Sequence, residues 1–202
     1  FEDAPCYPAE KLVKLHGMRR EMLAEEDSVR RERLVGEYLA FLDAMEKLPD
    51  APSRVYLWQE GNMPSSGKYL ENRDYRYNHD PDFRPYMYEF LLPEDAAPKG
   101  AVILCAGGDH GDCVIHEAYQ SCLDFNRLGY QSFMLLNRTN RMPYTGQECG
   151  ADAARLIRML RKDAAKYRIP QNRVAFAGFS NGGLTGEECI RYYSGSRKVT
   201  DY

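Results

Sequence analysis

The sequence predicts an α/β fold in which helices cover both faces of a mostly parallel sheet, with further helices at the N-terminus. After residue 100, apolar runs of strand length alternate with longer segments of helical periodicity. The runs are apolar at consecutive positions, which is typical of strands that are covered on both faces. This alternation favours a parallel sheet, because parallel strands need crossover connections.

Helical periodicity dominates residues 9–48. Apolar residues recur there at spacings of four, three and four, on Leu34, Tyr38, Phe41 and Met45. Such spacing places them on one face of a helix, and a second, weaker helix is expected before it. Pro49 and Pro52 end the pattern. We therefore expect an N-terminal helical extension at 1–52 and the α/β domain at 53–202.

Residues 53–83 are rich in turn-forming residues and aromatics, and we expect an irregular loop whose aromatic side chains pack on the domain. Arginines and tyrosines in this segment also imitate a nucleic-acid stacking surface, at Arg73, Tyr75, Arg76 and Tyr77. The formal net charge of −3 favours the loop. The following segment, 86–93, alternates Tyr86, Tyr88 and Phe90 on one side, which predicts a half-buried strand.

The rest of the chain alternates strands with helices. Strands are predicted at 101–106, 130–137 and 173–178. Helices are predicted at 115–129, 150–169 and 182–193, with Gly129 as the stop of the first.

A glycine-rich turn joins the last strand to the last helix, in "RVAFAGFSNGGLTGEECI" (173–190). Gly178, Ser180 and Gly182 complete G-x-S-x-G, which between a strand and a helix presents the serine as a nucleophile. Side chains at the two glycine positions would collide with the neighbouring strand and helix. The N–H of Asn181 can bind an oxyanion at the start of the helix. The alternative is a glycine-rich turn that only packs tightly.

The loop "CAGGDHGD" (105–112) is the expected source of a second oxyanion donor. Its glycines let the backbone approach a ligand, and we assign the backbone amides of Gly108 and Asp109 to the oxyanion hole. The same region suggests an alternative metal cluster, formed by Asp109, His110, Asp112, Cys113 and His116. The spacing of the two histidines does not place both on one helix face. We therefore expect no metal and no cofactor.

Three segments resemble an α/β-hydrolase of the esterase/lipase-like branch, which includes carbohydrate acetyl esterases. They are "AVILCAGGDHG", "LGYQSFMLLNR" and "DAARLIRMLRKDAAKYRIPQNRVAFAGFSNGG". The resemblance covers about residues 84–193. It implies an α/β-hydrolase fold, the nucleophile Ser180 and a small-molecule ester substrate, and it suggests that the N-terminal helices are a cap or an edge decoration. Asn181 stands where the family often has alanine and keeps the required amide.

A serine nucleophile needs a general base, and in this fold the triad acid and histidine follow the serine along the chain. All the histidines precede Ser180, at His16, His79, His110 and His116. Glu187, Glu188 and Asp201 follow it, but the first two lie on the elbow helix, from which they could not reach an imidazole on a distant loop. We therefore expect the acid and the histidine to come from residues outside this chain, with His110 as the alternative base.

The predicted strand at 174–178 supports the same expectation. It is central in the family, and without a further neighbour it would be an apolar edge with unpaired backbone groups. We expect a C-terminal segment or a second chain to complete the sheet, so that the fold is incomplete at the C-terminus of this chain.

The amino-acid composition limits the class of protein to which the chain can belong. The 202 residues are 44% hydrophobic and 28% charged, as in folded globular proteins. We expect neither nucleic-acid binding nor a membrane span, because the chain is slightly acidic and lacks a long apolar run. The six cysteines lack regular spacing, which favours buried free thiols over a disulfide or a reactive thiol and points to a cytoplasmic location. A cleaved signal peptide and a homo-oligomer stay open.

The sequence thus predicts a serine hydrolase of carboxylic esters, which cleaves acyl or acetyl esters and is inactive as this chain alone if the remainder is absent. A peptidase or an acyltransferase on the same fold is one alternative. A non-catalytic hydrolase-like module, whose N-terminal helices mediate association, is another.

Overall fold

The computed structural model describes residues 9–46, 53–64, 84–108, 113, 115–138 and 146–195. The chain divides into two compact units, Phe1–Ala51 and Pro52–Tyr202. The first unit contains the helices α1 (Ala9–Ala24) and α2 (Ser28–Glu46). They bury Met22, Leu34 and Tyr38, two of which lie on the predicted apolar face. Asp27 caps α2, since its Oδ1 accepts a hydrogen bond of 2.8 Å from the Arg30 N–H.

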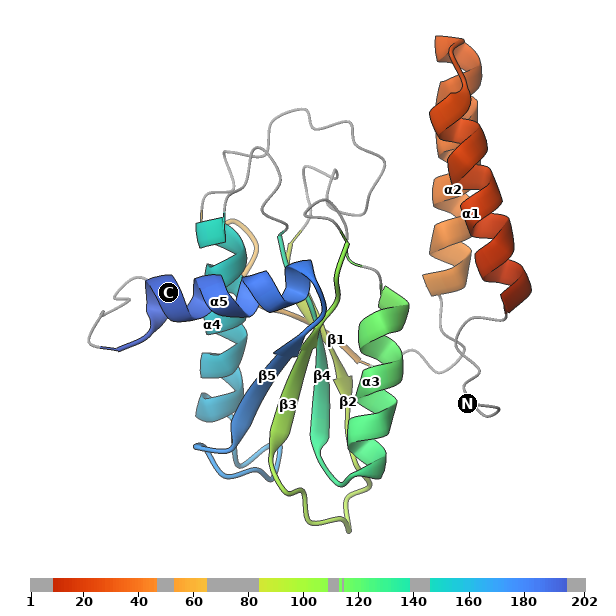
Figure 1. The fold of residues 1–202 in the computed structure, drawn as a ribbon. Coiled ribbons are helices and arrows are strands. Elements are labelled where there is room, and N and C mark those ends of the chain that lie inside the picture. Colours follow the sequence, from red (N-terminus) through yellow and green to blue (C-terminus); the bar gives the residue numbers. More distant parts are fainter. Residues whose placement is uncertain are drawn as a thin grey trace. The chain divides into compact units, whose positions relative to one another are not determined.

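The second unit is built on a five-stranded sheet with the order β1-β2-β4-β3-β5 (Figure 1). Its strands are β1 (Ser53–Tyr56), β2 (Tyr86–Phe90), β3 (Ala101–Cys105), β4 (Gln131–Leu136) and β5 (Val174–Gly178). β1 pairs antiparallel with β2, and β2 pairs antiparallel with β4, whereas β4, β3 and β5 are parallel. The predicted α/β class is confirmed, and the sheet is mixed.

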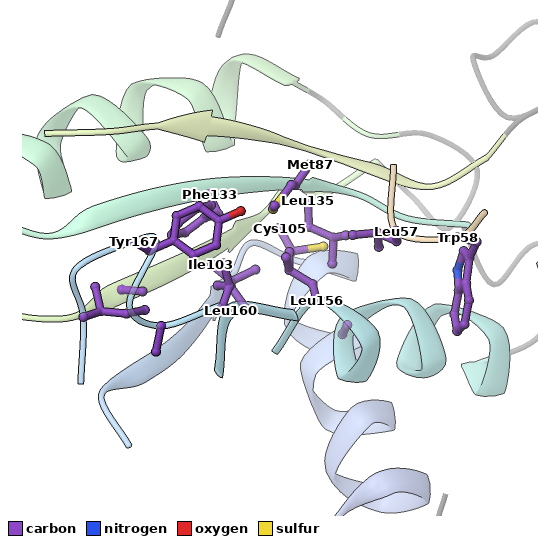
Figure 2. Packing of buried hydrophobic residues seen from close by; sticks show 14 of the residues in the cluster. Leu57, Trp58, Met87, Ile103, Cys105, Phe133, Leu135, Leu156, Leu160 and Tyr167 are labelled. Atoms are coloured by element: carbon purple, nitrogen blue, oxygen red, sulfur yellow. The ribbon is translucent and has the colours of Figure 1, made fainter. Parts of the chain in front are cut away.

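Helices cover both faces of this sheet. They are α3 (Ile115–Arg127), α4 (Gly146–Lys162) and α5 (Asn181–Tyr193). On one face, side chains of the central strands pack against α4, and this cluster includes Ile103, Phe133, Leu135, Leu156 and Leu160 (Figure 2). On the other face, alternate residues of the same strands pack with α3 in a cluster that includes Val102, Leu104, Met134, Ala118 and Cys122. Strands covered on both sides carry apolar runs, as β3 does over Ala101–Cys105.

The first half of the sheet differs from the prediction. β1 lies at 53–56, where an irregular loop was expected; residues 57–64 contain only turns and irregular backbone, and 65–83 fall outside the described residues. A strand of four residues carries too little periodicity to be detected, and β1 is fixed by pairing with β2. β2 is buried at all five positions instead of half-buried, because it lies between β1 and β4 and contributes to both apolar clusters.

The long helix α4 also has different bounds. It begins at Gly146, four residues before the predicted start, and ends at Lys162, after which turns follow. Six residues beyond this end, the chain makes a tertiary contact. Arg168 has a positive φ of 56°, and its guanidinium donates hydrogen bonds to the carbonyl oxygens of Leu92, Pro93 and Ala96. Those acceptors lie more than 70 residues earlier in the sequence.

Candidate active site

The pairing of β3 with β5 brings the predicted nucleophile and the predicted oxyanion loop to one edge of the sheet. The two strands are parallel and in register from Ala101 opposite Val174 to Cys105 opposite Gly178. The Phe179 N–H continues the ladder with a hydrogen bond of 3.0 Å to the Cys105 carbonyl oxygen. The segments that follow these strands are therefore neighbours, as expected at the carboxyl edge of a parallel sheet.

Ser180 occupies a strained position between β5 and α5. Its backbone has φ 48° and ψ −116°, and apart from glycine only Arg168 shares a positive φ within the described residues. A non-glycine residue with such a conformation costs about 1–3 kcal/mol. Serine at a helix N-cap usually accepts a hydrogen bond from the first turn, but the exposed Ser180 side chain makes no capping bond to α5.

Gly178 and Gly182 stand where no side chain fits. A Cβ on Gly178 would lie 2.3 Å from the backbone of Gly182, and a Cβ on Gly182 would lie 2.1 Å from the Cys105 carbonyl oxygen. These contacts are backbone against backbone, so a rotamer change cannot relieve them. The two glycines therefore allow α5 to start directly against the ends of β3 and β5.

The predicted oxyanion donors are placed in part. Asn181 is the first residue of α5 and is buried, and its carbonyl oxygen accepts a 3.2 Å hydrogen bond from Thr185 Oγ1. Gly108 is half-buried just beyond β3. Asp109 lies outside the described residues, and so do His110 and Asp112. Cys113 is buried, and no group of three metal-ligating side chains occurs in the described part of the chain.

Glu117, on the first turn of α3, is a site residue that sequence reasoning missed. Its Oε2 accepts a 2.8 Å hydrogen bond from the N–H of Gly107. A Cβ on Gly107 would lie 3.2 Å from the Cβ of Ser180, so this carboxylate is close to the serine turn. The only signal in the sequence was an acidic residue near the start of a predicted helix, which is common for helix-dipole reasons alone.

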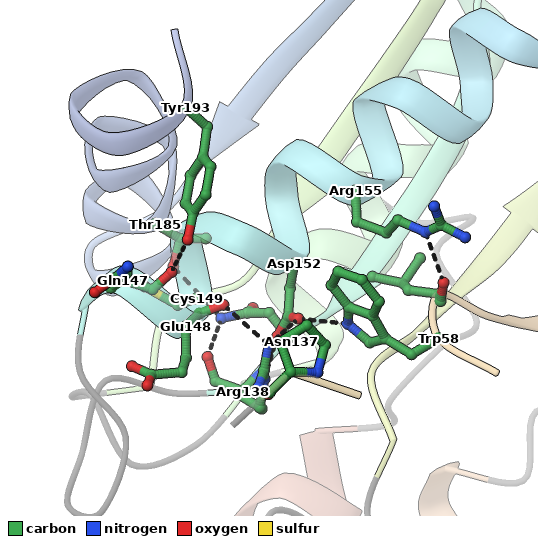
Figure 3. A network of polar contacts seen from close by, with 12 residues as sticks. Trp58, Asn137, Arg138, Gln147, Glu148, Cys149, Asp152, Arg155, Thr185 and Tyr193 are labelled. Atoms are coloured by element: carbon green, nitrogen blue, oxygen red, sulfur yellow. Dashed lines mark hydrogen bonds and ion pairs between the residues drawn. The ribbon is translucent and has the colours of Figure 1, made fainter. Parts of the chain in front are cut away.

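A buried ion pair lies just beyond the end of β4. Arg138 and Asp152 both have 0% exposed side chains, with Nη2 2.7 Å from Oδ1 and Nε 3.0 Å from Oδ2. The indole N–H of Trp58 donates to the same carboxylate at 2.8 Å, and Figure 3 shows Trp58 and Arg138 both reaching Asp152. Arg138 also donates to the carbonyl oxygen of Pro64. The pair thus joins β4, α4 and the segment after β1.

Asn137 connects the end of β4 to the elbow helix. Its Nδ2 donates to the Arg138 carbonyl oxygen at 2.7 Å and to Thr185 Oγ1 at 3.5 Å. Its Oδ1 accepts from the thiol of Cys105 at 3.2 Å. Because Thr185 in turn donates to Asn181, one chain of hydrogen bonds runs from β4 to the first turn of α5.

The described cysteines are free, and all but Cys189 are fully buried. Burial raises the pKa of the Cys149 thiol to about 12, and it raises the pKa values of Cys105 and Cys122 well above the ordinary value. Buried thiols with raised pKa values are poor nucleophiles. The expectation of free buried thiols therefore holds for these residues.

The carboxylates after Ser180 pair on the helix itself. Arg191 forms ion pairs with Glu187 at 3.6 Å and with Glu188 at 3.4 Å. The other oxygen of Glu188, Oε2, is buried without a hydrogen-bond partner among the described residues. It lies 3.0 Å from where a Cβ on Gly146 would be, so it belongs to the contact between α5 and α4.

The sheet order, the helices on both faces and the strand–serine–helix turn are those of the α/β-hydrolase fold, and the resemblance to its esterase-like branch is confirmed by comparison with solved structures. The acetyl ester-xyloside bifunctional hydrolase of Caldicellulosiruptor lactoaceticus is 26% identical, with a TM-score of 0.58 over 76% of this chain and 53% of that chain. Esterase 2 of Thermogutta terrifontis, phosphonylated by cyclosarin, shares the fold at 19% identity, with a TM-score of 0.51 over 69% of this chain and 46% of that chain.

A sequence relative extends the comparison. Endo-1,4-beta-xylanase B of Butyrivibrio fibrisolvens is 27% identical over 148 residues, which cover 69% of this chain and 23% of that protein. No protein-family model matches the chain. The chain thus spans about half the length of the bifunctional hydrolase and about a quarter of the length of the xylanase. None of the helices in the described part is long and apolar enough to cross a membrane.

Proposed function

We propose that the protein containing this chain hydrolyses carboxylic esters with Ser180 as its nucleophile. The observation that carries the proposal is the backbone of Ser180, at φ 48° and ψ −116°, combined with a side chain that does not cap α5. Strained residues of this kind cluster at active sites and ligand clamps. The likeness to an acetyl ester-xyloside hydrolase at 26% identity supports ester chemistry.

In the proposed reaction, Ser180 Oγ attacks the ester carbonyl carbon while its proton passes to a histidine. The backbone amide of Asn181, with that of Gly108 or Asp109, stabilises the oxyanion of the tetrahedral intermediate. The intermediate collapses to an acyl-enzyme as the alkoxide leaves with the proton from the histidine. Water, deprotonated by the same histidine, then releases the acid and restores Ser180.

We propose that the histidine and the triad acid come from a C-terminal segment or a second chain that also completes the sheet. Among the described strands, β5 pairs with β3 alone and forms the edge of the sheet. An uncovered edge invites pairing with another strand. A strand added there would run beside β5, and a loop at its carboxyl end would lie near Ser180.

For the substrate, we propose an acyl or acetyl ester on a carbohydrate. The support is the similarity to an acetyl ester-xyloside bifunctional hydrolase and to an endo-1,4-beta-xylanase. We further propose that residues 1–52 are an N-terminal extension to the hydrolase domain at 53–202, in line with the division into two compact units.

The test uses the full-length protein and a fluorophosphonate probe, which labels activated serines. We expect labelling of Ser180, and we expect Ser180→Ala to abolish both the labelling and the hydrolysis of p-nitrophenyl acetate. Ser194→Ala is a matched control, because Ser194 is an exposed serine just beyond α5 and its loss should leave both signals unchanged.

Other outcomes separate the alternatives. Folded full-length protein that takes up no probe and hydrolyses no ester favours a non-catalytic interaction module. Faster turnover of a peptide amide than of the matching ester favours a peptidase. Activity that survives in Ser180→Ala rejects this nucleophile.

A further inference from the structure

Glu117 ties the loop after β3 to the first turn of α3. A glutamate at the third position of a helix commonly reaches back to the N-terminus of its own helix. Here Oε2 accepts its 2.8 Å hydrogen bond from the Gly107 N–H, ten residues earlier in the sequence. A hydrogen bond to an ionised carboxylate is about twice as strong as a neutral one.

Gly107 also contacts the serine turn directly. A Cβ at this position would lie 2.9 Å from Glu117 Oε2, 3.1 Å from the Phe179 carbonyl oxygen and 3.2 Å from Ser180 Cβ. The loop backbone is therefore held between α3 on one side and the nucleophile turn on the other. Because the Gly107 N–H is bound by Glu117, this amide is not a donor for an oxyanion, which leaves the role to the amides that follow it.

We propose that Glu117 is a positioning residue for the oxyanion loop, an inference that rests on the proposed function. By holding the Gly107 amide, the carboxylate fixes the peptide that leads into Gly108, so that the next N–H is already oriented for the oxyanion before the substrate binds. Donors fixed in advance stabilise the transition state without reorganisation. A small displacement of such a group costs rate rather than substrate affinity, since the bound ester carries no oxyanion and the charge develops only as the serine attacks.

The test measures p-nitrophenyl acetate hydrolysis by full-length variants. These variants distinguish the effect of the length of the Glu117 side chain from the effect of its charge. Glu117→Asp keeps the charge but shortens the side chain, and Glu117→Gln keeps the length and an acceptor oxygen but removes the charge. We expect Glu117→Asp and Glu117→Ala to lower kcat by about tenfold or more, with KM changed by less than about threefold. We expect Glu117→Gln to keep at least about a third of the wild-type kcat, because its amide oxygen accepts the same bond.

Asp124→Ala is the matched control, since Asp124 is an exposed acidic residue on the same helix. It should leave kcat and the labelling rate unchanged. Wild-type kcat in Glu117→Asp and Glu117→Ala overturns the inference, and so does an equal loss of kcat in Glu117→Gln and Glu117→Asp.

The fluorophosphonate labelling separates this inference from the proposed function. If the wild-type protein is labelled at Ser180 and Glu117→Asp is labelled equally fast, the positioning role alone is rejected. If Ser180 of the wild-type protein is not labelled, the proposed function fails, and the positioning role fails with it.

Discussion

Gly182 at the start of α5 lies against Cys105 at the end of β3, so closely that a Cβ on the glycine would be 2.1 Å from the cysteine carbonyl oxygen. Backbone touches backbone at this point, and nothing can rotate away. The contact sets the distance between the elbow helix and the sheet, and it thereby sets the position of Ser180.

We expect Gly182→Ala to lower the free energy of unfolding by about 1–3 kcal/mol, because the added methyl forces the backbone apart. Gly183→Ala is the matched control, since its Cβ would meet nothing closer than the Gly178 carbonyl oxygen at 3.5 Å, and alanine favours the helix by up to about 1 kcal/mol. Urea unfolding of the full-length variants measures both. Equal stabilities for the two variants would contradict the close contact.

Because the backbone of Ser180 is strained, we expect that a residue that relieves the strain raises the stability of the protein while removing its esterase activity. Glycine adopts a positive φ without steric cost. The free energy of unfolding of Ser180→Gly should therefore be about 1 kcal/mol higher than that of Ser180→Ala. Both variants should lack esterase activity. Thermal or urea unfolding compares them, and a glycine variant no more stable than the alanine variant would show that the turn is unstrained.

The ion pair between Arg138 and Asp152 is fully buried, so breaking it should strongly destabilise the folded protein. We expect Asp152→Ala to lower the free energy of unfolding by about 3–5 kcal/mol, because it leaves the guanidinium unpaired in the interior. The double variant Arg138→Met, Asp152→Leu should cost less than the single one, since it leaves no buried charge. A double variant that is less stable than Asp152→Ala contradicts this reasoning.

An exposed ion pair provides the comparison. Arg127 and Asp124 lie 3.0 Å apart on the surface of α3, with more than half of each side chain exposed. Exposed pairs contribute about 0–1 kcal/mol, so Asp124→Ala should change stability little. Urea unfolding measures both pairs under the same conditions.

The buried thiol of Cys149 predicts a loss of stability in alkali. Burial raises its pKa from the ordinary value of 9.0 to about 12 on folding, so between these values the unfolded chain loses a proton that the folded chain keeps. Stability from this group is therefore complete below pH 9 and falls as the pH rises toward 12.

Cys149→Ala should make the decline of unfolding free energy with pH shallower by about one proton over that interval. Urea unfolding at several pH values measures the slope. Exposed lysines and tyrosines contribute equally in both proteins and cancel in the comparison. Identical slopes for the variant and the wild type would show that this thiol titrates normally.

Much of the fold was predictable because its signals are local. The strands β3 and β4 are buried at every position, and β3, β5 and the later part of β4 are unbroken apolar runs. The turn at Ser180 was predictable because a strained bend between a strand and a helix demands glycine on both sides. Such constraints act within a few residues, and one sequence reveals them.

Other features were not predictable because they depend on partners far along the chain. β1 is a strand because it pairs with β2. Glu117 binds the Gly107 N–H only because the loop after β3 lies beside α3 in the folded chain. Arg138 and Asp152 are charged, and charged residues are normally exposed. Nothing in the sequence indicates that these two pair with each other in the interior.

The sequence by itself determined the alternation of strands and helices and the identity of the serine at the sharp turn, since both follow from side-chain patterns and glycine sterics within short windows. Only the tertiary structure decided which carboxylate binds the Gly107 amide, which charges are buried together, and that residues 53–56 form a strand paired with β2. Those outcomes depend on contacts between segments tens of residues apart, and the chain reaches them only when it is folded.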